Sequence, residues 1–102
     1  MKIKNAIKEY ILECQIKKYT ARTVRNYQNT LNRFLTYCEE NELKNMDDLT
    51  MTDIKIYTKK LIDNGAKGGY INSTLKILKS WLGYIWEEYE IGVDTRLKKF
   101  NY

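Results

Sequence analysis

The sequence predicts an all-α fold, a compact bundle of four helices without a sheet. Apolar residues recur at steps of three and four over four separate segments, which is the spacing of one helix face. No segment shows the alternation of apolar and polar residues, bounded by turns, that is typical of a strand. Only short polar stretches separate the four segments, so consecutive helices should pack side by side.

The size and composition of the chain fit one globular domain covering residues 1–102. Hydrophobic residues make up 43% and charged residues 30% of the sequence, values that a folded soluble chain has and a disordered chain lacks. The longest apolar run, residues 81–86, is too short to span a bilayer. The first ten residues lack the apolar core of a secretory signal. We therefore expect a cytoplasmic protein with no membrane partner.

The first two helices are expected over residues 3–17 and 21–40. Tyr19 and Thr20 interrupt the apolar pattern, and the Thr20 hydroxyl can cap the second helix by accepting from a free backbone amide. The apolar side of the first helix carries Ile3, Ile7, Tyr10, Ile11 and Cys14. That of the second carries Val24, Tyr27, Leu31, Phe34, Leu35 and Cys38.

The last two helices are expected over residues 51–63 and 70–89. Residues 43–49 form a connector, and Thr50 with Asp53 then follows the capping-box pattern that opens a helix. Gly65 should end the third helix, and residues 66–69 form a flexible loop. The apolar sides carry Ile54, Tyr57, Leu61 and Ile62 in the third helix, and Ile71, Leu75, Leu78, Leu82, Ile85 and Tyr89 in the fourth. Trp81 and Trp86 flank the latter set, and the tail, residues 91–102, is expected to be weakly ordered.

The residue types argue against an enzyme, a cofactor site or a metal site. The chain has no His, the commonest general base, and no nucleotide-binding or metalloprotease motif. Asp47 and Asp48 are adjacent, so their side chains point apart. Cys14 and Cys38 alone cannot supply an ordinary four-ligand zinc site. We expect both thiols to be buried and reduced, with a disulfide as the alternative.

Basic and acidic residues are segregated along the chain, which carries a net charge of +5. Acids gather in residues 39–48 and 87–90, whereas bases gather in residues 17–33, at Lys76 and Lys79, and in residues 96–99. Such segregation indicates an oriented surface. The polar side of the second helix carries Arg22, Arg25, Asn26, Asn29 and Arg33, with Lys17, Lys18 and Thr20 at its start. The fourth helix carries Asn72, Ser73, Lys76, Lys79 and Ser80, with Tyr70 beside the loop.

Two interpretations of these polar strips are open. Lys and Ser suit phosphates, and Arg and Asn can also bind base edges, so each strip could contact DNA. The strip of the second helix would be about 16 Å long, within the reach of a helix in a major groove. The alternative is that the strips are ordinary solvated faces, as most such strips are. The aromatic residues could stack on single-stranded bases, but Tyr10, Tyr27, Tyr57, Trp81 and Tyr89 lie on or beside apolar stripes, which favours core packing.

Three motifs, in order, resemble the core-binding domain of phage-type integrases, the tyrosine recombinase family, over about residues 3–92. They are Thr23-Val24-x-x-Tyr27-x-x-x-Leu31-x-x-Phe34-Leu35, Asp48-Leu49-Thr50-x-x-Asp53-Ile54-x-x-Tyr57-x-x-x-Leu61, and Ile71-Asn72-x-x-Leu75-x-x-Leu78-Lys79-Ser80-Trp81. The resemblance implies a SAM-like bundle that forms half of a C-shaped clamp on double-stranded DNA, with the second and fourth helices facing the duplex. Catalytic residues would lie in a separate domain of the same polypeptide, and other protomers would join in a synaptic complex.

Two other functions are compatible with a helical bundle. One is a protein–protein interaction module, whose sign would be an exposed apolar patch around Trp86 and Tyr89. The other is a helix-turn-helix regulator, which is disfavoured because no pair of short helices is joined by a three- or four-residue turn.

Overall fold

The computed structural model describes residues 1–92 and confirms the predicted all-α fold. The elements are α1 (Ile3–Ile16), α2 (Ala21–Glu40), the 3-10 helix η1 (Met46–Asp48), α3 (Met51–Asp63) and α4 (Gly68–Tyr89). Within the described residues, Lys2 and Asn45 form one isolated antiparallel β-bridge, and no β-strand is present. The predicted weakly ordered tail lies, from residue 93 on, outside the described residues.

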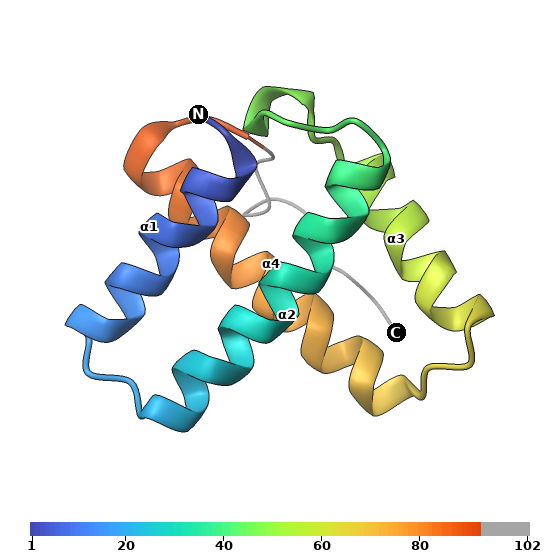
Figure 1. Cartoon of the computed structure of the whole chain (residues 1–102), viewed down its shortest axis with the longest axis horizontal. Helices are drawn as coiled ribbons and strands as arrows, with labels where there is room; N and C mark the ends of the chain where they lie inside the picture. Colours follow the sequence, from blue (N-terminus) through green and yellow to red (C-terminus); the bar gives the residue numbers. More distant parts are fainter. Residues whose placement is uncertain (93–102) are drawn as a thin grey trace.

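Helix α4 is the centre of the bundle, because it contacts each of the other three α-helices. Figure 1 shows α2 crossing α4, with α1 on one side of the crossing and α3 on the other. Helices α1 and α2 also pack against each other. The first turns of α2 and α4 both lie at the lower edge of Figure 1, and the two helices rise from there toward opposite upper corners. The starts of the two predicted polar strips therefore share one edge of the molecule.

The core forms where the predicted apolar stripes meet. Phe34 is fully buried, and its ring centroid lies 5.0 Å from that of Tyr57, 5.9 Å from that of Trp81 and 6.0 Å from that of Tyr37. Every residue of the predicted stripe on α1 is buried. The stripes of α2, α3 and α4 are also buried or half-buried, apart from two residues.

Those two residues, Ile62 and Tyr89, were predicted to be in the core and are exposed. Both lie in the last turn of their helix, where the neighbouring helix no longer covers them. Tyr89 is 42% exposed, and its hydroxyl donates to Glu9 Oε2 at 3.1 Å. The prediction that Tyr89 packs in the core is therefore wrong.

The segment predicted as a plain connector contributes to the core. Met46 and Leu49 are buried, and η1 closes one end of the bundle. Backbone hydrogen bonds hold this segment against the N-terminus, from Ile3 N to Lys44 O at 2.9 Å and from Met46 N to Met1 O at 2.9 Å. Tyr37 and Thr30 of α2 are also buried, although they lie beside the predicted stripe.

The helix starts largely follow the sequence. The Thr20 side chain accepts from Thr23 N, and Thr50 with Asp53 forms the predicted capping box. Helix α4 begins at Gly68, two residues earlier than predicted, so the loop before it is shorter.

Helices α1, α2 and α3 all end in a Schellman motif. Tyr19 N bonds to Cys14 O at 3.1 Å, Leu43 N to Cys38 O at 2.8 Å, and Ala66 N to Leu61 O at 3.0 Å. The left-handed residue is Gly65 in α3, as predicted. In α1 and α2 it is Lys18 (φ 61°) and Glu42 (φ 58°), which the sequence does not reveal.

Cys14 and Cys38 are buried, as predicted, and neither is in a disulfide. Burial raises the pKa of both thiols, that of Cys38 to about 12. Both side chains therefore pack as small neutral groups at physiological pH. None of the helices in residues 1–92 is long and apolar enough to cross a membrane.

Candidate nucleic-acid interface

The polar strip of α2 is exposed along its length. Arg22, Asn26, Asn29 and Arg33 follow one another at steps of four, three and four, so they share one side of the helix. Arg22, Arg25, Asn26 and Asn29, together with Thr23, line a shallow open depression. The ion pairs within residues 1–92 are Lys17–Glu13 and Lys59–Asp63, so the three arginines have no carboxylate partner there.

The start of α2 is less available to an anion than the sequence suggests. The Thr20 hydroxyl accepts from Thr23 N at 3.2 Å and donates its proton to Thr23 Oγ1 at 2.9 Å. Lys17 Nζ lies 3.5 Å from Glu13 Oε2. Thr20 therefore acts as a helix cap, and Lys17 is ion-paired with the carboxylate of Glu13. Lys18 is exposed and has no ion-pair partner in the described part of the chain.

A contact that the sequence does not predict joins the two strips. Arg33 Nη1 donates to the Tyr70 hydroxyl at 3.1 Å, and the guanidinium carbon lies 5.9 Å from the centre of the Tyr70 ring. Tyr70 stands in the first turn of α4. These residues are 37 positions apart, so no local signal could pair them. The contact places the far end of the α2 strip beside the beginning of the α4 strip.

The polar strip of α4 lies opposite its core-facing side. Asn72, Ser73, Lys76 and Ser80 are exposed, and Lys79 is half-buried. Neither lysine forms an ion pair within residues 1–92. The neighbouring side chains Ile71, Leu75 and Leu78 are buried.

Both helices change the sign of their charge along their length. In α2 the cations span residues 22–33 and the acids Glu39 and Glu40 close the helix; in α4 the lysines at 76 and 79 precede Glu87 and Glu88. Because the first turns of both helices lie at the lower edge of Figure 1, the acidic ends lie toward the upper corners. The two crossed helices thus present cations toward one edge and anions away from it.

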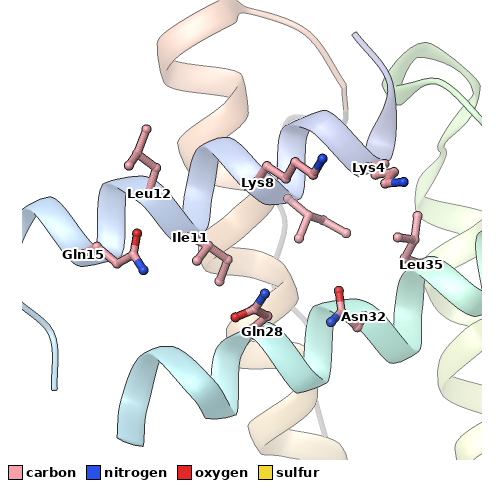
Figure 2. Close-up of a pocket in the computed structure, with 9 residues that line it drawn as sticks. Lys4, Lys8, Ile11, Leu12, Gln15, Gln28, Asn32 and Leu35 are labelled. Atoms are coloured by element: carbon pink, nitrogen blue, oxygen red, sulfur yellow. The ribbon is translucent and has the colours of Figure 1, made fainter. Parts of the chain in front are cut away.

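Outside the two polar strips, the described surface has a groove but no metal cluster. No group of three or more His, Cys, Asp or Glu residues within residues 1–92 could hold a metal ion. A groove between α1 and α2, drawn in Figure 2, has Ile11, Gln28 and Asn32 facing across it and Lys4 and Lys8 above it. Sequence analysis did not predict this groove, since its walls come from two helices.

Comparison with protein families supplies an independent finding. The profile described as phage integrase, N-terminal SAM-like domain, matches residues 7–89. Comparison with curated proteins and with solved structures gives no significant match. The matched span begins within α1 and ends at the last residue of α4, so it covers the bundle described above. The chain therefore belongs to the family of N-terminal SAM-like domains of phage integrases, which links it to DNA recombination.

Proposed function

We propose that this chain is the DNA-binding domain of a site-specific tyrosine recombinase and clamps double-stranded DNA at the crossover site through α2 and α4. The observation that carries the proposal is the row of exposed arginines on α2, free of acidic partners within residues 1–92 and tied to α4 by the Arg33–Tyr70 contact. The catalytic residues would be supplied by another domain of the same polypeptide. Other protomers would complete a synaptic complex on DNA in the cytoplasm.

The side chains divide by the part of DNA that they suit. Lys18, Lys76 and Lys79, helped by Lys17, would neutralise phosphates, and Ser73 and Ser80 would donate to phosphate oxygens. Arg22, Arg25, Asn26, Asn29 and Asn72 would contact the backbone or base edges in the major groove. Arg33 and Tyr70 would hold the two helices at a fixed separation and contact the backbone between them. Thr20 would act through the helix cap that positions Arg22.

Salt dependence of binding tests this proposal. If about five phosphates are neutralised, the logarithm of affinity should fall with the logarithm of salt concentration at a slope of about −4 to −5. Fluorescence anisotropy of a labelled duplex, titrated between 50 and 300 mM salt, measures that slope. Affinity should be modest, because half a clamp lacks the avidity of two linked domains. Absence of binding at low salt, or affinity that does not change with salt, would refute the proposal.

A helical protein–protein interaction module is the second candidate. The observation in its favour is that apolar side chains remain on the surface, with Tyr89 exposed and Trp86 half-buried at the end of α4. In that case Arg22→Ala and Lys79→Ala would leave binding of the biological partner intact. The same substitutions should weaken DNA binding if the first proposal is right.

A further inference from the structure

A long groove between α1 and α2 contains none of the proposed DNA contacts. Its first part is lined by Ile7, Ile11, Gln28 and Leu35 among others, and Lys4 and Lys8 stand above it (Figure 2). A second hollow shares Lys4 and Leu35 with the first and continues to Leu43 and Lys44. The two hollows together form one groove with an apolar floor.

Apolar surface extends beyond the groove along α1. Leu12 stands on the outer rim and points away from α2 in Figure 2, and it is 52% exposed. Ile16, one turn further on, is 66% exposed. Neither contributes to the core or to a polar strip. An apolar groove with an apolar rim is the kind of surface that a protein partner covers.

The charge around the groove is mostly positive. Lys2, Lys4, Lys8 and Lys44 surround it, whereas Glu39 is the acid that lines it. None of these lysines forms an ion pair within the described part of the chain. The complementary partner is therefore a segment that carries both apolar and acidic side chains.

Such a segment is present on the chain itself, at the end of α4. Trp86 and Tyr89 are interleaved with Glu87, Glu88 and Glu90, and we call these five residues the acidic end. The three glutamates and Tyr89 are exposed. The Tyr89 hydroxyl donates to Glu9, and this hydrogen bond, then burial and the charges of Glu9 and Glu88, raise the pKa of Tyr89.

On its own molecule the acidic end contacts a side of α1 that does not form the groove. It contacts α1 through Glu9, which lies with Glu13 on one side of that helix. Lys4 and Lys8 lie one turn apart on a different side of α1, toward α2. The groove and the acidic end thus face different directions, as required for contact between two molecules.

We propose that the groove between α1 and α2 binds the acidic end of a second copy of this chain. Trp86 and Tyr89 would cover the apolar floor and rim, and Glu87 and Glu88 would lie against Lys4 and Lys8. The contact joins different surfaces of the two copies, so it is head-to-tail and can continue into longer chains or close into a ring. The proposal is independent of DNA binding, because it uses none of the residues assigned to the duplex.

Sedimentation equilibrium of the 102-residue protein without DNA tests this proposal. At low salt the average mass should rise above 12.2 kDa with concentration, and added salt should reverse the rise. Two charge-reversed variants test the contact: the groove variant Lys4→Glu/Lys8→Glu and the end variant Glu87→Lys/Glu88→Lys. Each should weaken association at least about tenfold, since like charges then face each other. An equal mixture of the two variants should associate again, because the unchanged groove of one meets the unchanged acidic end of the other.

Two controls separate this contact from other effects. Lys55→Glu/Lys60→Glu makes the same charge change at exposed positions of α3, outside the groove and both polar strips, and should leave association unchanged. The recovery in the mixture shows that both variants are folded. A wild-type protein that stays monomeric, variants that associate like the wild type, or a mixture that stays monomeric would each overturn the proposal. A wild-type protein that associates but does not bind duplex DNA at low salt would overturn only the proposed function.

Discussion

Replacing Arg22 and Arg25 by alanine should weaken DNA binding by an amount that the structure allows us to estimate. Both side chains are exposed, line the same depression and lack ion pairs within residues 1–92. Each neutralised phosphate contributes about 0.9 to the salt slope, and hence about 0.9 logarithmic units of affinity at 0.1 M salt. Arg22→Ala/Arg25→Ala should therefore reduce the slope by about 2 and the affinity about 60-fold at that salt concentration.

The assay is anisotropy of a labelled duplex over a series of salt concentrations. Lys55→Ala/Lys60→Ala is the matched control, because it removes the same charge from exposed positions of α3 that are outside both polar strips and lack ion pairs within residues 1–92. The control should keep a slope close to that of the wild type. If the arginine variant kept the wild-type slope, or if the control lost as much affinity, binding would depend on net charge alone and the assignment to α2 would be wrong.

Three further predictions concern the stability of the fold. Phe34→Ala should lower the free energy of unfolding by about 3–5 kcal/mol, because it leaves a cavity among three aromatic rings. If urea unfolding showed a decrease in that free energy below about 1 kcal/mol, the packing described would be contradicted. Glu42→Gly should raise that free energy by about 0.5–1 kcal/mol, since glycine adopts the left-handed conformation without steric cost, and a lower melting temperature would argue against this helix end. Burial raises the pKa of Cys38 from 9.0 and of Tyr57 from 10.0, both to about 12, so the folded chain keeps protons that the unfolded chain releases. Urea unfolding should therefore show stability falling from about pH 9 to 12, by up to about 1.4 kcal/mol per pH unit for each group, whereas constant stability would contradict their burial.

The helices were predictable because their signals are local. Apolar residues at steps of three and four mark the buried sides, and Thr20, Thr50 and Gly65 mark helix ends through contacts within one turn. Met46 and Leu49 were missed because a three-residue helix is too short to show a period. Glu42 was missed because an acidic residue carries no sign of the left-handed conformation that the chain requires there.

The candidate site was predictable only in part, for a related reason. The polar side of a helix follows from its apolar side, so the residues of both strips were found from spacing alone. How the strips relate to each other depends on the packing of α2 against α4, which placed Arg33 against Tyr70. Likewise, the groove beside Lys4 and Lys8 exists only because α1 and α2 pack together.

The central claim is that duplex DNA binds the exposed sides of α2 and α4 near their starts. The most direct measurement is a titration of the isotopically labelled chain with a short duplex, followed by amide chemical-shift changes in NMR spectra. We predict that the largest changes fall on residues 18–33 of α2 and the turn before it, and on residues 70–80 of α4, with little change in the α1–α2 groove or at Glu87–Glu90. Changes centred on the groove or on α3, or spectra unaffected by DNA, would contradict the account.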